Sequence, residues 1–212
     1  MQLTEVIARR RMTRRFDPES AVPVEVVHDL VALAIRAPSA GFSQGWDFLA
    51  LLSPADRAHF WQAAAERDAD GEPAPGGTGW LAGVSAAPAL ILCLADPTAY
   101  LDRYAEPDKG WVDRDPARWP VPYWDTDVAM AALLILLGAT DRGLGSLFFG
   151  VPADRHEAVK AALSVPEDRR IVGVIALGQE RTRVDGSAAT RRRRPLADVL
   201  HLGRFGAPAA TG

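Results

Sequence analysis

Two clusters of arginine stand near opposite ends of the sequence, and both have residue types suited to binding an anion. The first contains Arg10, Arg11 and Arg14, and the second contains Arg191 and Arg193. A phosphate group needs several forked cations or backbone N–H donors that converge at one point, and the planar guanidinium supplies two donors in a fixed geometry. The alternative is that each cluster is a solvated run of charge, and taken alone the clusters favour that alternative.

No other constellation of side chains in the sequence indicates a catalytic class. The four histidines are scattered without metal-ligand spacing, so no metal site is expected. The sequence contains no dinucleotide-binding fingerprint, no Walker loop and no serine nucleophile elbow. The single cysteine, Cys93, lies in an apolar run and is expected to be a small core residue. Asp125 and Asp127 are interpreted as part of a helix start rather than as an acid–base pair.

The composition is that of an ordinary globular protein. The chain has 212 residues, of which 48% are hydrophobic and 24% charged, and its net charge is −3. We therefore expect one domain over residues 1–212, with neither nucleic acid nor a membrane as a partner. The first residues lack the apolar core of a signal peptide, and the apolar run 128–137 is shorter than a bilayer span. A cytoplasmic location is expected.

The elements that must position these residues follow from hydrophobic periodicity. Apolar residues at helical spacing between Pro23 and Pro38 predict an amphipathic helix. The same reasoning predicts a short helix from Leu3 into the basic stretch, helices over 54–66, 125–142 and 154–163, and strands over 47–52, 89–94, 146–149 and 171–177. Residues 70–79 are rich in Gly, Pro and acids, which predicts an exposed loop. This mixture predicts an α+β or α/β fold with one sheet.

Two further segments are unusual. Residues 100–124 combine tryptophans and tyrosines with prolines and charges, so the segment is interpreted as a lid or pocket wall. The predicted helix that follows is apolar on every face from Val128 to Ala139, and such a helix must be covered all round. Either the interior of the domain or a subunit interface can supply that cover.

Four motifs, in this order, resemble the nitroreductase family. Residues 10–16, Arg-Arg-Met-Thr-Arg-Arg-Phe, are similar to its Arg-Arg-Ser-x-Arg-x-Phe opening, and residues 37–48 resemble its Ala-Pro-Ser-x-x-Asn-x-Gln-Pro-Trp-x-Phe segment. Asp127, the apolar helix and the Gly-Leu-Gly turn at 143–145 are similar to its central helix, and residues 193–205 resemble its C-terminal segment. Each motif alone is weak, but together they span nearly the whole chain.

The resemblance implies a three-layer α/β/α architecture of the α+β class, with a central, mostly antiparallel sheet and an intertwined homodimer. It implies an FMN site between the subunits, in which the arginines hold the phosphate and ribityl chain, the loop 38–42 faces the partner's flavin, and a backbone N–H near residue 149 is aimed at the flavin N5. The implied cofactor-binding residues are Arg10, Arg11, Met12, Arg14, Pro38, Ser39, Ala40, Phe42, Phe148, Phe149, Gly150, Arg191 and Arg193. No catalytic side chain is expected, because the flavin carries the redox chemistry.

The implied activity is a two-electron, ping-pong reduction in which NAD(P)H reduces FMN and a small nitroaromatic, quinone or similar acceptor reoxidises it. The residues expected to line the substrate pocket are Trp111, Trp119, Tyr123 and Trp124. Three residues depart from the family pattern: Phe42 replaces Asn, Gly45 replaces Pro and Met12 replaces Ser.

Two alternatives to this activity remain open. Phe42 is also seen in the branch of the family that fragments flavin to make dimethylbenzimidazole. The first alternative is therefore a specialised flavoenzyme of the same fold, either such a synthase or a biosynthetic dehydrogenase. The second is a flavin-binding protein without turnover.

Overall fold

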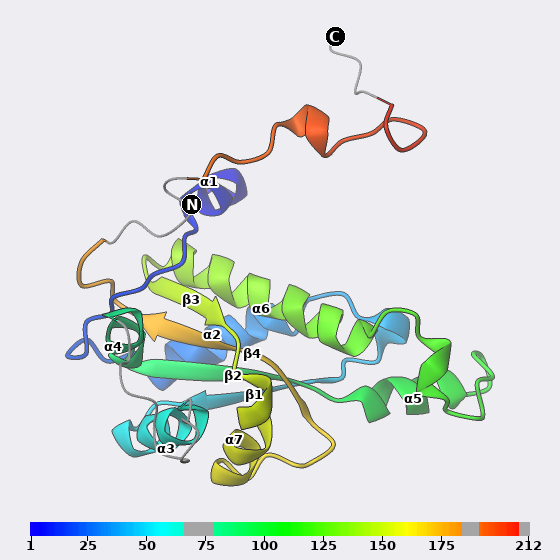
Figure 1. The fold of residues 1–212 in the computed structure, drawn as a ribbon, viewed down its shortest axis with the longest axis horizontal. Coiled ribbons are helices and arrows are strands. Elements are labelled where there is room, and N and C mark those ends of the chain that lie inside the picture. Colours follow the sequence, from blue (N-terminus) through cyan, green and yellow to red (C-terminus); the bar gives the residue numbers. More distant parts are fainter. Residues whose placement is uncertain (66–78, 184–190, 208–212) are drawn as a thin grey trace.

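The fold is built on one antiparallel sheet (Figure 1). The computed structural model describes residues 1–65, 79–183 and 191–207. Within these residues the strands are β1 (Trp46–Leu51), β2 (Ala89–Ala95), β3 (Gly145–Phe149) and β4 (Arg170–Gly178), and the sheet order is β1-β2-β4-β3. All three strand pairs are antiparallel. The predicted strands are confirmed, with ends that differ by at most one residue.

The central strand β2 explains why the sheet is covered on both faces. Every residue of β2 is buried, and successive side chains of a strand point to opposite faces. Ile91 and Cys93 therefore belong to one apolar core, while Leu90 and Leu92 belong to the other. A short continuous apolar run, unlike an alternating one, requires a helical layer on each side.

Helices form those two layers (Figure 1). On one face lie α2 (Val24–Ala34) and α6 (Tyr123–Asp141), which pack against each other and against the sheet. On the other face lie α3 (Pro54–Ala64) and α7 (His156–Ala162), with α4 (Gly79–Ser85) at one end. The expected three-layer α/β/α architecture of the α+β class is therefore confirmed.

Several local predictions need correction. The segment 100–124 is not wholly irregular, because its first residues belong to α5 (Pro97–Ala105), which begins where Asp96 accepts hydrogen bonds from the Thr98 and Ala99 amides. The central helix begins at Tyr123, two residues before the predicted start. The predicted helix 154–163 is a 3-10 turn, Ala153–Arg155, followed by α7. Helix α4 has no counterpart among the predicted elements, and its first residue is the last residue of the predicted loop 70–79. Residues 70–78, and residue 66 of the predicted helix 54–66, lie outside the described part of the chain.

Helix α6 is covered on one side only. Val128, Ile135 and Ala139 are buried against the sheet and α2, whereas Met130 and Leu133 are exposed. By length and composition α6 is apolar enough to cross a membrane, but 44% of that stretch is buried inside the fold, as in the core helix of a globular domain. The domain interior therefore covers only part of this helix, and the side that carries Met130 and Leu133 remains exposed.

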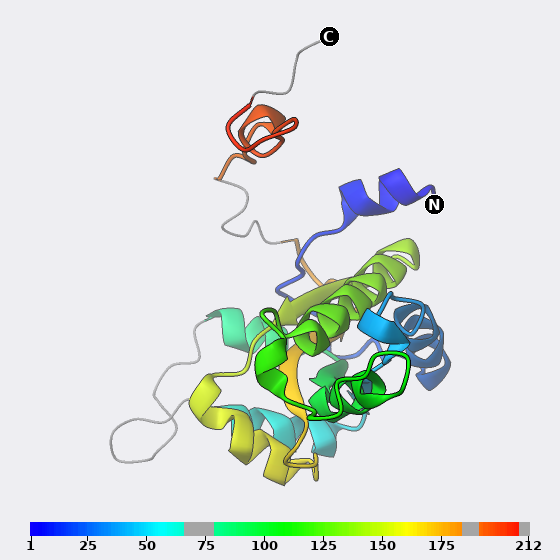
Figure 2. The ribbon, with the colours of Figure 1, turned by 90° about the vertical axis from the view of Figure 1, so that its right-hand side faces the viewer.

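The first helix and the last described segment of the chain lie on the same side of the molecule. Helix α1 (Leu3–Arg9) lies there, and residues 191–207, which we call the C-terminal arm, stand away from the body in both views (Figures 1 and 2). The arm contains a 3-10 turn, Leu196–Asp198, and most of its apolar side chains are exposed, with Phe205 at 91%. An apolar arm without cover is unusual for a chain that folds alone.

Between α1 and α2 the chain runs along one border of the sheet. The Thr13 amide donates to the carbonyl of Ser146 on β3 at 2.8 Å. Further on, the Asp17 amide donates to Gln179 at 2.9 Å, and the Arg181 amide donates to the Arg15 carbonyl at 3.1 Å. Residues 12–17, which follow the first arginines, are therefore held by segments that come late in the sequence.

Candidate functional site

The N-terminal arginines lie where α1 ends and this border segment begins. Arg10 follows the last residue of α1, and its Nη1 is buried without a hydrogen-bond partner among the described residues. Arg14 donates to the carbonyl of Met12 at 3.2 Å. Arg11 differs from both, because its two terminal nitrogens bind both carboxylate oxygens of Glu180. Arg10 is therefore the member of the cluster whose charge-bearing group most lacks a partner.

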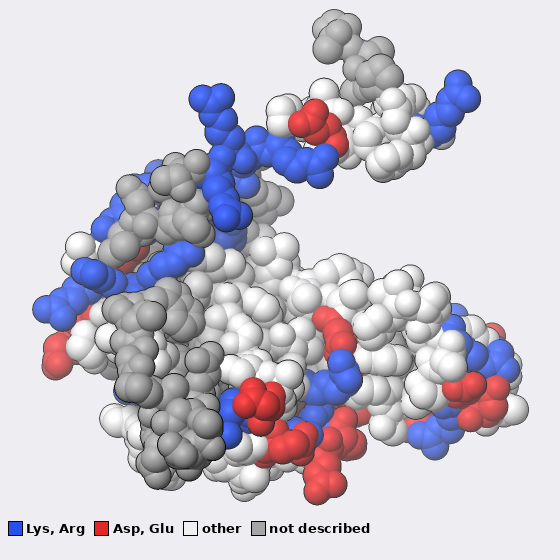
Figure 3. Space-filling view, viewed as in Figure 1, with Lys and Arg blue, Asp and Glu red and all other residues white. Residues whose placement is uncertain are grey.

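The second cluster lies on the C-terminal arm, where Arg191 and Arg193 are exposed. Figure 3 shows Lys and Arg side chains gathered over the N-terminal border segment and the start of the arm, while mixed charges cover the opposite end of the molecule. The two clusters, which are 180 or so residues apart in sequence, are thus brought to the same side of the fold.

Strand β3 presents its backbone at the edge of the sheet, next to the first arginines. Because β3 is an edge strand, alternate N–H groups point away from β4. The Phe148 amide is one of these, and it meets the Met12 sulfur at 3.5 Å. Gly150, two residues on, is exposed and continues the same row. Met12, which replaces the family's serine, therefore contacts the backbone at one of the predicted positions.

The side chains of Phe148 and Phe149 lie on opposite faces of the sheet. The Phe148 ring packs on the backbone of Gly173 of β4, so closely that a side-chain carbon there would collide with it. The Phe149 ring stacks on Trp61 of α3, with ring centroids 5.6 Å apart and planes 6° from parallel. The Phe149 side chain therefore belongs to the second core, and only its backbone lies on the sheet edge next to the arginines.

The small-residue loop predicted to face the flavin has an uncommon backbone. We call residues 39–42 the loop segment; it contains the 3-10 turn Ala40–Phe42, and Pro38 before it is exposed. Gly41 and Phe42 have φ values of 62° and 58°, in the left-handed region that side chains other than glycine rarely adopt. Phe42 is 75% exposed. The loop segment thus displays an aromatic ring on a backbone that needs outside support.

That support comes from two helices. The Asp127 carboxylate of α6 is 2% exposed, and its Oδ2 accepts the Ala40 amide at 2.8 Å and the Tyr100 hydroxyl at 2.8 Å. The Arg103 Nε of α5 donates to the Gly41 carbonyl at 2.9 Å. Burial, and then the hydrogen bond to Asp127, raise the pKa of Tyr100, so the phenol keeps its proton and remains a donor. The interpretation of Asp127 as a helix-start residue is therefore wrong.

The predicted pocket residues Trp111, Trp119, Tyr123 and Trp124 form one cluster. Trp119 lies at its centre, with ring centroids within 6.0 Å of those of Trp111, Tyr123, Trp124, Tyr100 and Tyr104. Both Tyr123 and Trp124 belong to α6. The Trp124 side chain is buried in the core, whereas Tyr123 is 42% exposed. The cluster reaches the loop segment through Tyr104, because a side-chain carbon at Gly41 would lie 2.6 Å from that ring. These aromatics therefore pack against one another and support the loop segment.

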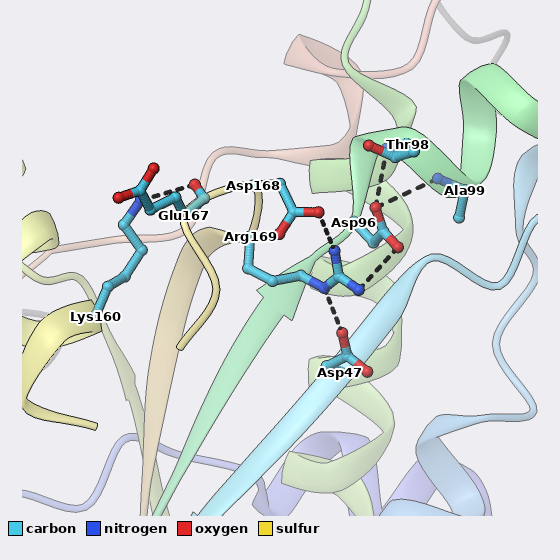
Figure 4. Close-up of polar contacts among 8 residues, drawn as sticks. All are labelled: Asp47, Asp96, Thr98, Ala99, Lys160, Glu167, Asp168 and Arg169. Atoms are coloured by element: carbon cyan, nitrogen blue, oxygen red, sulfur yellow. Dashed lines mark hydrogen bonds and ion pairs between the residues drawn. The ribbon is translucent and has the colours of Figure 1, made fainter. Parts of the chain in front are cut away.

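An ion-pair cluster where β1 begins and β2 ends fixes the start of α5 (Figure 4). Arg169 binds Asp47 of β1 at 2.7 Å, Asp96 at 3.1 Å and Asp168 at 2.9 Å. Although burial alone would lower the pKa of Arg169, the hydrogen bond that Arg169 donates to Asp47 and the charges of the neighbouring carboxylates raise it. Asp96 also caps α5. Asp47, a residue with no counterpart in the family pattern, thus joins β1 to the start of α5.

These supporting contacts have no local signal in the sequence. Tyr100 and Arg103 lie in the segment 100–124, which is predicted to be a lid or pocket wall, and no spacing in it indicates that they face residue 40. Within the described residues, no three metal-ligating side chains lie close enough together to hold a metal ion.

Together these features define a three-layer α+β protein in which arginines and exposed backbone amides lie along the β3 edge of the sheet, whereas the supported aromatic loop precedes β1 at the other edge. The sequence profile of the Nitroreductase family matches residues 7–179, so the chain belongs to the nitroreductase family.

Individual relatives agree with this assignment. A protein of Archaeoglobus fulgidus, inferred to be an NADH dehydrogenase/NAD(P)H nitroreductase, is 26% identical over 93% of this chain and 95% of its own. An inferred nitroreductase from Exiguobacterium sibiricum, crystallised in complex with FMN, is 18% identical with a TM-score of 0.73, covering 94% of this chain and 96% of its own. A nitroreductase family protein from Streptococcus pneumoniae is 19% identical with a TM-score of 0.71, covering 94% and 99%. The solved structures share the fold.

Proposed function

We propose that this protein is an FMN-dependent oxidoreductase that uses NAD(P)H to reduce a small nitroaromatic, quinone or similar acceptor. Membership of the nitroreductase family supports the oxidoreductase class. The proposed cofactor is supported by the relative of the same fold that binds FMN, and the proposed electron donor is supported by the description of the Archaeoglobus relative.

The observation that carries the cofactor proposal is the buried, unpartnered Nη1 of Arg10. A buried charged donor without an acceptor is costly, and a phosphate oxygen is the acceptor that a guanidinium binds best. Arg14, Arg191 and Arg193 supply further cations from the two segments described above, so the residues present fit the phosphate end of FMN. Arg11, already paired with Glu180, contributes less.

The remaining predicted residues would surround and orient the flavin ring. When bound, FMN supplies two-electron redox chemistry, and the protein supplies binding and orientation. We assign the backbone at Phe148, Phe149 and Gly150 as the edge that faces the ring, with the outward-pointing amides of Phe148 and Gly150 as the donors, because a fixed N–H dipole stabilises charge that develops nearby. The loop 38–42 supplies the wall that faces the partner's flavin.

The proposed assembly is a homodimer. The exposed side of α6, with Met130 and Leu133, and the apolar side chains of the C-terminal arm are two surfaces that the chain leaves uncovered. A second copy can cover both at once, because the arm of each subunit reaches away from its own body. Such an exchange would also carry Arg191 and Arg193 across the interface.

The test is an absorption spectrum of the purified protein, followed by the mass of the cofactor that heat releases. We expect a flavin spectrum and the mass of FMN; the mass of FAD, or no binding after reconstitution with excess FMN, would overturn the proposal. NADH or NADPH oxidation is then measured with a quinone acceptor. Bound FMN with no turnover would identify a flavin-binding protein instead, and loss of flavin with release of dimethylbenzimidazole would identify a flavin-fragmenting synthase.

A further inference from the structure

We infer that Asp127, together with Tyr100 and Arg103, positions the cofactor-facing loop segment, so that these residues determine flavin affinity without touching the flavin. The inference rests on the proposed function, because it assumes that residues 39–42 face FMN. It assigns a role to a buried carboxylate that the redox chemistry does not require.

The first step is the location of the carboxylate. Asp127 lies in the apolar part of α6, with Val128 and Ala131 of the same core beside it. Its described partners are the Ala40 amide, the Tyr100 hydroxyl and the hydroxyl of its neighbour Thr126. No cation pairs with Asp127 among the described ion pairs. An apolar residue would pack α6 on the sheet without the desolvation penalty of a carboxylate, so packing does not explain this aspartate.

The second step is what the loop segment requires. Phe42 has a φ of 58°, and a non-glycine residue in that region is held only when the surroundings fix it. Asp127 fixes the amide at the start of the turn, and Arg103 fixes the carbonyl of Gly41 immediately before Phe42. With one donor and one acceptor of the turn bound to different helices, the backbone cannot rotate without breaking a bond on one side.

The third step connects both contacts to one rigid unit. Tyr100 and Arg103 lie on α5, and the Tyr100 hydroxyl joins α5 to Asp127 on α6 at the point where Ala40 binds. Helix α5 is in turn capped by Asp96, which Arg169 holds to the sheet. Side-chain contacts therefore connect the loop segment to the sheet through α5. Asp127 is the residue at which the two helices and the loop segment meet.

The test compares Asp127→Ala, Asp127→Asn and the control Asp125→Ala in the full-length protein, both without flavin and with FMN added. Asp125 lies two residues earlier on α6 and pairs with Arg170 rather than with the loop segment. The first readout is hydrogen–deuterium exchange of peptides spanning residues 37–46, which needs no activity. The second is the dissociation constant for FMN, measured by quenching of flavin fluorescence.

We expect Asp127→Ala to accelerate exchange in this peptide and to weaken FMN binding about tenfold or more, as for loss of a hydrogen bond to a charged group. Asp127→Asn should show exchange rates and FMN affinity close to those of the parent, because the amide oxygen can accept the same two hydrogen bonds. Asp125→Ala should change neither. If Asp127→Ala leaves exchange at 37–46 and FMN affinity at parental values, the inference is wrong, even though the parent binds FMN as proposed.

A milder variant keeps the test decisive if Asp127→Ala does not fold. Tyr100→Phe removes one donor to Asp127 and retains the ring, and Tyr104→Phe, one turn later on α5, is its match because no described residue binds the Tyr104 hydroxyl. Tyr100→Phe should accelerate exchange at 37–46, and Tyr104→Phe should not. Equal exchange in the two variants would overturn the inference. Failure of the parent to bind FMN would instead overturn the proposed function, since the exchange result does not depend on flavin.

Discussion

Replacing Arg10 by alanine should weaken flavin binding without destabilising the flavin-free protein. The reason is that Arg10 Nη1 is buried and has no partner among the described residues. In the flavin-free protein this group contributes an unsatisfied donor, so removing it relieves a penalty. In the flavin-loaded protein the same group would donate to the phosphate. The mutation should therefore change stability and affinity in opposite directions, which an ordinary structural arginine would not do.

The size of the effect follows from the contact that is lost. Hydrogen bonds to charged groups contribute about 1.5–3 kcal/mol, and each 1.4 kcal/mol or so is a factor of ten in a dissociation constant. The Kd for FMN should therefore rise by about tenfold to a hundredfold in Arg10→Ala. Arg11→Ala is the matched control: it removes the neighbouring guanidinium, but one that Glu180 already holds. Its Kd for FMN should change several-fold at most.

Thermal unfolding with and without FMN measures both quantities. A ligand that binds the folded state raises its stability by an amount set by the ratio of free ligand to Kd, so the FMN-induced increase in Tm should shrink in Arg10→Ala. The Tm of the flavin-free variant should equal or exceed that of the parent. If Arg10→Ala binds FMN as tightly as the parent does, or if Arg11→Ala loses as much affinity, the assignment of Arg10 to the phosphate is refuted.

Three other predictions follow from the structure. Leu133→Glu places a charge on the exposed side of α6 and should halve the mass seen by light scattering at low micromolar concentration; an unchanged dimer mass would place the interface elsewhere. Tyr123→Leu should change the KM for the acceptor more than that for NAD(P)H, whereas Trp124→Leu, in the core, should lower the free energy of unfolding by roughly 1–3 kcal/mol; the reverse pattern would remove Tyr123 from the substrate pocket. Burial raises the pKa of the Cys93 thiol from its ordinary value of 9.0 to about 12, so the unfolded chain releases that proton first and the free energy of unfolding should fall as pH rises through this window. Denaturant titrations at pH 8 and pH 10 should show a smaller loss of unfolding free energy in Cys93→Ala than in the parent, and an equal loss would contradict the raised pKa of this thiol.

Much of the fold could be predicted because its signals are local. The run that became β2 is apolar without interruption, and Pro23 and Pro38 bracket α2 by restricting the backbone around them. Helix α5 was missed for an equally local reason. Its start, Asp96-Pro97, comes directly after the apolar run of β2, where such a pair can simply end a strand. The same pair is also a good helix N-terminus, because Asp caps and Pro fits the first turn.

The site was less predictable, because its important contacts join residues far apart in sequence. Nothing near Asp127 indicates that its partner is the amide of Ala40, 87 residues away. Likewise, Arg10 and Arg11 are adjacent and chemically identical, and only the position of Glu180 separates the free guanidinium from the paired one. Motif similarity located the candidate site, whereas the state of each side chain depends on tertiary neighbours.

The border segment described above also has a consequence for biosynthesis. Residues 12–17, which follow Arg10, are held by Ser146 and by Gln179 and Arg181, all of which leave the ribosome long after them. In a nascent chain, the segment that follows the first arginines therefore lacks these backbone hydrogen bonds until the last described strand of the sheet has been synthesised. Contacts of such long sequence separation form late and slowly. The proposed phosphate-binding segment should accordingly be among the last parts of the protein to reach its folded position.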